Sequence, residues 1–231
     1  GRRFVEKARQ TALKKPVAAI KIGRSEAGAR AAASHTGSLA GSEKIFDAAL
    51  NRAGIIRLNT PNELLDVGEA FSRCKTPKGN RIAILTDGGG HGVMATDTAE
   101  QFGLDAFVLS EATQSKLRAI LKPHCPIRNP VDLAGTPEGD MWVFDRCAEV
   151  LLDDPEVDGL VIVGLYGGYC DLSEEFRQLE MDVAKSLAQR AIASDKPVVM
   201  HSIYQAQRPE SLTYLMEHGF PVYASIDAAM R

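Results

Sequence analysis

The chain has 231 residues, of which 45% are hydrophobic, and its formal net charge is −3. This length allows one large domain or two small ones, and the apolar content is sufficient for ordinary hydrophobic cores. The weakly negative charge gives no sign of a nucleic-acid partner. No apolar run approaches the length of a membrane span, so we expect no membrane partner either.

The chain begins with an alternation of helix and strand patterns. Its first part is predicted to contain helix 4–14, strand 17–22, helix 38–52, strand 55–58 and helix 61–72. Between strand 17–22 and helix 38–52 lies a loop of small residues, which we expect to carry His35 to the start of the helix. The free N–H groups and partial positive charge of a helix start suit an anion such as phosphate. The alternative is a histidine that is merely structural or exposed.

The polar segment 73–80, which contains Pro and Gly, predicts a boundary between domain 1–75 and domain 80–231. Only two strands precede this segment, and two parallel strands do not make an independently stable sheet. The chain also starts with neither an initiator methionine nor a signal peptide. We therefore expect the first domain to be truncated at its N-terminus and the chain to be cut from a longer protein.

The second domain continues the alternation over more strands. The elements expected there are strand 81–86, helix 91–102, strand 106–109, helix 111–121, helix 139–152, strand 159–164, helix 174–193, strand 197–201, helix 208–218 and strand 221–223. Continuously apolar strands separated by helices imply a parallel sheet covered on both faces. The predicted class is thus α/β, with two doubly wound, flavodoxin-like domains whose ligand loops follow the carboxyl ends of the strands.

Strand 81–86 leads into a glycine-rich turn that precedes a helix. Backbone N–H groups in such a turn can hold an anion, whereas the alternative is a tight turn that needs glycine for steric reasons. The predicted phosphate-binding residues are Gly88, Gly89, Gly90, His91 and Gly92.

Three further features are candidate ligand contacts, each with a structural alternative. Asn129 and Asp132 belong to a loop in which Pro130 favours an extended Asn129, and they either shape that loop or line a nucleotide or phosphate site. Arg24 and Arg30 flank the histidine loop and contact phosphate or CoA, or lie solvated on the surface.

Four cysteines stand far apart and form no C-x-x-C pair: Cys74, Cys125, Cys147 and Cys170. This pattern predicts free thiols in a reducing cytoplasm. A metal site built from His124, Cys125 and the distant His201 is conceivable, but no ligand-pair spacing supports it, so no metal site is predicted.

The segment 23–41, with Ser34-His35-Thr36-Gly37-Ser38-Leu39-Ala40-Gly41 at its end, resembles the phosphohistidine segment of NDP-forming acyl-CoA synthetases. These enzymes belong to the succinyl-CoA synthetase superfamily. The resemblance implies that His35 is catalytic, with Ser34 and Thr36 as possible ligand contacts. The glycine turn is similar to the family's loop at the phosphate, although Asp87 and His91 stand where Asn and Pro are more usual. His91 is then a second phosphate contact or a tolerated substitution.

The same resemblance implies an organisation and a reaction. Residues 1–75 correspond to the C-terminal part of the phosphohistidine domain, and residues 80–231 to a second ligase-CoA domain. An acyl-CoA, phosphate and ADP are interconverted with a small carboxylic acid, CoA and ATP. The complete enzyme needs Mg²⁺, an ATP-grasp domain or subunit and a CoA-binding domain, so this chain alone is expected to be inactive and to bind none of these cofactors firmly. A homo-oligomer is possible. The alternative function is a non-catalytic, ligand-sensing region of a protein acetyltransferase, and a third is an assembly scaffold.

Overall fold

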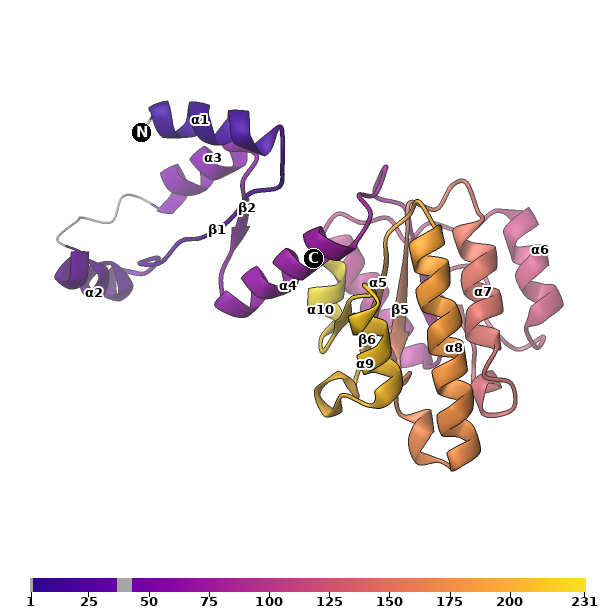
Figure 1. Cartoon of the computed structure of the whole chain (residues 1–231). Coiled ribbons are helices and arrows are strands. Elements are labelled where there is room, and N and C mark those ends of the chain that lie inside the picture. The colour runs from indigo at the N-terminus through magenta and orange to yellow at the C-terminus, as the bar shows by residue number, and fades with distance from the viewer. Residues whose placement is uncertain (1, 37–42) are drawn as a thin grey trace. The chain divides into compact units, whose positions relative to one another are not determined.

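The computed structural model describes residues 2–36 and 43–231, except for the side chains of His35 and Thr36. The chain divides into two compact units, Gly1–Glu69 and Ala70–Arg231 (Figure 1). Each unit contains parallel strands and helices, which confirms the predicted α/β class. The predicted domain boundary at 73–80 follows the end of a helix, and that boundary stays a prediction.

The first unit is built around two short parallel strands. Its elements are α1 (Arg2–Ala12), β1 (Ala18–Ile20), α2 (Glu26–Thr36), α3 (Glu43–Ala53), β2 (Ile56–Leu58) and the start of α4 (Pro61–Arg73). Ala18 lies opposite Ile56 and Ile20 opposite Leu58 in the strand pair. A small core forms where the end of α3 packs against residues of α1 and β1, so this unit buries few side chains.

Residues 26–36 form helix α2, where the sequence analysis predicts a loop. Five of the eleven residues are alanine, the strongest helix former, and this outweighs Gly28. The Ser25 hydroxyl caps the helix by accepting a hydrogen bond from the Gly28 N–H at 3.0 Å. His35 therefore lies in the last turn of a helix. The helix predicted to follow it is α3, which starts at Glu43 in the described part of the chain, and the predicted start at residue 38 lies outside that part.

The second unit contains a five-stranded parallel sheet in the order β4-β3-β5-β6-β7. Its strands are β3 (Ile82–Thr86), β4 (Val131–Asp132), β5 (Gly159–Gly164), β6 (Val198–Ser202) and β7 (Val222–Tyr223). Counted within the unit, this order is 2-1-3-4-5, the doubly wound order typical of flavodoxin. The order of neighbours reverses between β3 and β5, and ligands of such sheets bind outside the carboxyl ends at that point.

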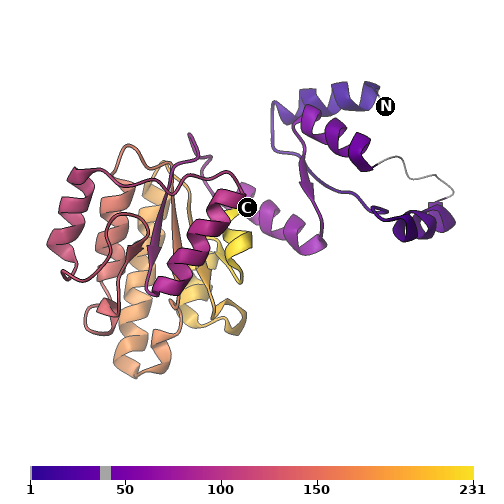
Figure 2. The ribbon, with the colours of Figure 1, turned by 180° about the vertical axis from the view of Figure 1, so that it is seen from behind.

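Helices cover both faces of this sheet (Figures 1 and 2). On one face, Ile82 and Ile84 of β3 pack with α5 (Gly89–Gln101) and α10 (Ile226–Met230). On the other face, Ala83 and Leu85 join the larger core, which is formed with α6 (Glu111–Ile120), α7 (Val143–Leu152), α8 (Glu174–Ala193) and α9 (Glu210–Glu217). Three short 3₁₀ helices complete the unit: η1 (Thr136–Glu138), η2 (Tyr169–Asp171) and η3 (Gln205–Gln207). Among the described residues, no helix is both long enough and apolar enough to cross a membrane.

Residues 106–109 are not a strand, although the sequence analysis predicts one there. The side-chain amide of Asn129 lies beside β3 and makes the hydrogen bonds that a neighbouring strand at 106–109 would otherwise make with β3. Its Oδ1 accepts a hydrogen bond from Ile84 N, and its Nδ2 donates to the carbonyl oxygens of Ile82 and Phe107, all at 2.9 Å. A side chain that fills the hydrogen-bonding positions between two segments keeps them too far apart to pair.

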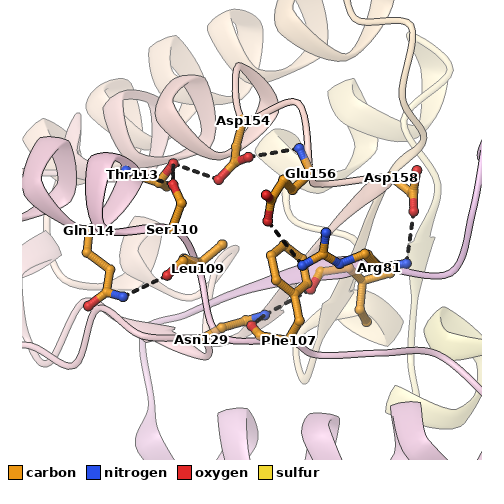
Figure 3. A network of polar contacts seen from close by, with 11 residues as sticks. Arg81, Phe107, Leu109, Ser110, Thr113, Gln114, Asn129, Asp154, Glu156 and Asp158 are labelled. Atoms are coloured by element: carbon orange, nitrogen blue, oxygen red, sulfur yellow. Dashed lines mark hydrogen bonds and ion pairs between the residues drawn. The ribbon is translucent and has the colours of Figure 1, made fainter.

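Polar contacts around Arg81 hold the amino-terminal end of the sheet (Figure 3). The Arg81 guanidinium lies 3.7 Å from the centre of the Phe107 ring and 3.1 Å from Glu156, and its backbone N–H donates to Asp158 at 3.0 Å. These groups satisfy one another, so this end of the unit is a structural support.

Limited proteolysis tests the predicted domain boundary. We expect trypsin to cut after Lys75 or Lys78, because this segment is outside regular structure and mostly exposed. The longest-lived fragment should run from residue 76 or 79 to the C-terminus, since strands buried on both faces protect the second unit. N-terminal sequencing identifies the cut. A persistent fragment that begins within 82–223 would contradict the boundary.

Candidate functional site

The start of helix α5 lies at the carboxyl end of β3, where the strand order reverses. We call residues 87–92 the glycine loop. The Gly88 N–H donates to Thr86 Oγ1 at 3.1 Å, and the first helical bond runs from Gly92 N to Gly88 O at 3.2 Å. The N–H groups of Gly89, Gly90 and His91 therefore have no acceptor within the helix. Because the first turn contains no acidic residue, this helix start can stabilise an anion.

Packing also favours glycine at two of these positions. A Cβ on Gly92 would lie 2.9 Å from Thr86 Cγ2, and one on Gly88 would lie 2.9 Å from Nδ1 of His91. A Cβ on Gly90 would meet nothing within 4 Å. The loop is thus both a tight turn and a set of exposed amides, so its two predicted roles are compatible.

The Asp87 carboxylate faces the loop after β5. Asp87 is only 7% exposed; its Oδ1 accepts a hydrogen bond from Leu165 N at 2.8 Å, and its Oδ2 accepts one from the Tyr169 hydroxyl at 3.0 Å. Burial raises the pKa of Asp87, while these bonds and the nearby His91 lower it. Both oxygens are thus used to join two loops across the point where the strand order reverses.

A second buried carboxylate, Glu180 of α8, supports the same loop. Its Oε1 accepts hydrogen bonds from Gly167 N at 2.7 Å and Tyr169 N at 3.2 Å, and its Oε2 accepts one from the Ser211 hydroxyl at 3.0 Å. Glu180 is fully buried, and burial raises its pKa. The sequence analysis missed Glu180 because it is one of several acidic residues in a helix, and no local signal distinguishes it.

Asn129 lies just before β4 and Asp132 lies in β4, the strand that pairs with β3. The side-chain amide of Asn129 is bonded to backbone groups, and its φ of 103° differs from the extended conformation predicted before Pro130. Asp132 Oδ1 accepts a hydrogen bond from Ala134 N at 2.9 Å, and Oδ2 lies 3.0 Å from the position of a Cβ on Gly89. The structure thus brings Asp132 to the glycine loop, whereas Asn129 shapes the fold; as ligand contacts, both stay predictions.

The predicted site residues of the first unit lie in and around α2. Arg24, which precedes His35 in the chain, donates hydrogen bonds to Glu43 at 3.0 Å and to Asn59 at 2.6 Å, two residues that follow His35. The Ser34 hydroxyl donates to Ala31 O at 2.7 Å. The side chains of His35 and Thr36 lie outside the described residues. The roles of all these residues in binding stay predictions.

A pocket of about 400 Å³ adjoins the glycine loop on the face covered by α5 and α10. We call it the α5–α10 pocket. Helix α5 contributes His91, Met94, Asp97 and Thr98. The remaining lining residues are His201 of β6, Ile203 just after that strand, and Ile226 and Asp227 of α10.

His201 is the most unusual residue of this pocket. It is only 5% exposed, and its Nδ1 is buried without a hydrogen-bond partner. Its ring centre lies 5.9 Å from that of His91. Burial, together with the neighbouring imidazole, lowers the pKa of His201 to about 4, so the ring is neutral near pH 7. Among the described residues, no three His, Cys, Asp or Glu side chains are grouped as metal ligands.

Replacement of Asn129 measures its structural role. We expect Asn129→Ala to lower the free energy of unfolding of the second unit by about 3 kcal/mol, because three hydrogen bonds are lost and the backbone groups near β3 lose their partners. The exposed Asn80, which donates one bond to Gly103 O, is the matched control, and Asn80→Ala should cost less than about 1 kcal/mol. Urea unfolding measures both variants, and equal losses would contradict the assignment.

Two protein-family models match the chain. Residues 1–71 match the succinyl-CoA ligase like flavodoxin domain, and residues 82–229 match the Ligase-CoA domain. Among curated relatives, the ADP-forming acetate–CoA ligase II subunit alpha of Pyrococcus furiosus is 39% identical over 96% of this chain and 47% of its own length. The ligase I subunit alpha of the same organism is 36% identical over 100% of this chain and 48% of its own length.

A solved structure agrees with these matches. The dinucleotide forming acetyl-coenzyme A synthetase 1 of Ca. Korarchaeum cryptofilum, in complex with phosphate and ADP, superposes with a TM-score of 0.83 at 29% identity. The match covers 99% of this chain and 48% of that protein. This chain thus spans about half the length of the relatives that it matches. It belongs to the Ligase-CoA domain family and is a relative of the ADP-forming acetate–CoA ligases.

Proposed function

We propose that this chain is the part of an NDP-forming acid–CoA ligase that carries the phosphorylated histidine and one phosphate-binding helix start. The observation that carries this proposal is the glycine loop, whose free amides lie at the point of strand-order reversal in a family member. His35 is the proposed nucleophile, on the resemblance of residues 23–41. The curated relatives named as ligases support an enzyme over a ligand-sensing region.

The proposed reaction passes through an acyl phosphate. Phosphate attacks the thioester carbonyl of the acyl-CoA, which releases CoA as its thiol and forms the acyl phosphate. A neutral ring nitrogen of His35 then attacks phosphorus, the bond between phosphorus and the acyl oxygen breaks, and the acid leaves as its carboxylate. Finally, the phosphoryl group passes from His35 to ADP, which gives ATP and restores the imidazole. Each step is reversible, and the reverse sequence makes acyl-CoA.

In this reaction the glycine loop stabilises the negative charge of the phosphoryl group. The N–H groups of Gly89, Gly90 and His91 can donate to oxygens of the phosphoryl group, and the helix dipole adds to their effect. The Asp87 carboxylate is hydrogen-bonded to the loop after β5. It therefore does not compete with the phosphoryl group for these N–H donors. The partly exposed His91 side chain supplies an additional donor.

The proposed cofactors and partners are those of the complete enzyme. ATP or ADP and CoA are its substrates, and an ATP-grasp module and a CoA-binding domain are the proposed partners. Mg²⁺ usually binds through one or two carboxylates plus nucleotide phosphates, and Asp132 offers a carboxylate next to Gly89 of the glycine loop. A cytoplasmic location and a possible homo-oligomer complete the proposal.

The test of His35 is phosphoryl labelling of the complete enzyme with labelled ATP. We expect an acid-labile, alkali-stable label on the wild type and none on His35→Ala, because the nucleophile is removed. This chain alone should label poorly, since the partner groups that orient the imidazole are missing. An unlabelled complete enzyme would contradict the proposal, and equal labelling of the isolated chain would show that the partners are dispensable.

The test of the glycine loop is Gly89→Val. The new side chain would meet Asp132 Oδ2, 3.0 Å from the Cβ position, and would cover the amides, so we expect at least a tenfold loss of phosphoryl transfer to His35 in a folded protein. Gly139→Val is the control, because the nearest atom to a Cβ there lies 3.9 Å away. Rapid-quench labelling measures both rates. Unchanged transfer in Gly89→Val would reduce the loop to a tight turn.

A further inference from the structure

Tyr169 is held in the loop after β5 by its backbone and by its ring. Its backbone N–H donates to Glu180 Oε1 at 3.2 Å, and its ring packs edge to face with Phe144, with 6.3 Å between the ring centres. Only 8% of Tyr169 is exposed. The hydroxyl therefore has a fixed position, and there it donates to Asp87 Oδ2 at 3.0 Å.

The Tyr169 hydroxyl keeps its proton and so remains a hydrogen-bond donor. Burial, together with the neighbouring Asp87 carboxylate, raises the pKa of Tyr169 above its usual value. A hydrogen bond from a hydroxyl to a carboxylate is stronger than one between neutral groups. Tyr169 thus binds one oxygen of Asp87 firmly, while the Leu165 N–H binds the other at 2.8 Å.

The negative charge bound by Tyr169 lies close to the start of α5. In the sequence, Asp87 directly precedes Gly88, the residue that caps this helix. Burial raises the pKa of Asp87, and one of the groups that lower it is His91 in the first turn of α5, so the carboxylate lies within electrostatic range of the helix start. A carboxylate in this place acts against an anion at the helix start unless other donors hold it.

We propose that Tyr169 is a positioning residue of the phosphate site, because its hydroxyl keeps the Asp87 carboxylate on the loop after β5 and away from the amides of the glycine loop. This inference rests on the proposed function, in which the helix start of α5 binds the phosphoryl group. Without the hydroxyl, Asp87 Oδ2 loses its donor, and a buried carboxylate oxygen without a partner is costly. The N–H groups of the helix start then offer it an alternative, and the carboxylate competes there with phosphate.

Binding of inorganic phosphate to the complete enzyme that contains this chain, measured by calorimetry, tests this role. We expect Tyr169→Phe to weaken this binding by at least about tenfold, the smallest effect usual for the loss of a hydrogen bond to a charged group. Gly89→Val, which covers the amides, identifies the binding that belongs to the glycine loop.

Tyr166→Phe is the matched control for Tyr169→Phe. Tyr166 lies in the same loop and is only 1% exposed, and its hydroxyl donates to the backbone oxygen of Glu180 at 2.7 Å rather than to Asp87. Both variants lose one buried hydrogen bond, and urea unfolding measures the stability that each loses. Only Tyr169→Phe should bind phosphate more weakly than the wild type does.

The replacement Asp87→Asn separates an effect of charge from an effect of packing. Without the carboxylate there is no charge to hold, so Asp87→Asn should bind phosphate at least as tightly as the wild type. The double variant Tyr169→Phe/Asp87→Asn should then bind it as Asp87→Asn does. If Tyr169 acted only through packing, the double variant would be at least as weak as Tyr169→Phe.

Several results would overturn the inference. They are a wild type whose phosphate binding is absent or unaffected by Gly89→Val, an unchanged affinity in Tyr169→Phe, an equal loss in Tyr166→Phe, and a double variant that is no better than Tyr169→Phe. Labelling of His35 judges the proposed function separately. An enzyme with the expected pattern of phosphate binding but without label on His35 would remove the proposed function and support the role of Tyr169.

Discussion

The second unit depends on one buried carboxylate that joins two loops at the point where the strand order reverses. Asp87 accepts hydrogen bonds from Leu165 N and from the Tyr169 hydroxyl, and these groups come from the segment after β5. The two loops are thereby fixed relative to each other. Glu180 in turn accepts hydrogen bonds from Gly167 N and Tyr169 N and so fixes the loop after β5. The position of the glycine loop therefore depends on two successive sets of buried hydrogen bonds.

This arrangement decides where negative charge lies around the helix start. A carboxylate aimed at the N–H groups of α5 would occupy the site that an anionic ligand needs. The structure avoids this because Asp87 is turned toward β5, and Gly164 leaves the required space: a Cβ there would lie 1.9 Å from Asp87 Oδ1. The φ of 140° at Gly164 is also one that side-chain-bearing residues rarely adopt. Glycine at the end of β5 is therefore a condition for free amides at α5.

The sequence predicts the parts of the fold that local patterns control. Strand 159–164 and helix 174–193 are found within their predicted limits, because an uninterrupted run of apolar and glycine residues indicates a strand buried on both faces, and a twenty-residue segment without Gly or Pro favours a helix. The loop predicted around His35 is a helix because alanine content outweighs glycine, and 106–109 is irregular because Asn129 binds beside β3. The partners of Asp87 and Glu180 lie 78, 82, 13, 11 and 31 residues away along the chain, so no local pattern indicates them.

The bonds of the Asp87 side chain explain one departure of the glycine loop from the pattern that the resemblance implies. At position 87 an asparagine would accept the Leu165 N–H equally well, but its NH₂ group would leave the Tyr169 hydroxyl without an equivalent charged acceptor. Aspartate accepts both bonds at the cost of a buried charge: burial raises the pKa of Asp87, and the hydrogen bonds from Leu165 and Tyr169 lower it. The carboxylate is thereby held on the loop after β5, and the amides of the helix start stay available for an anion.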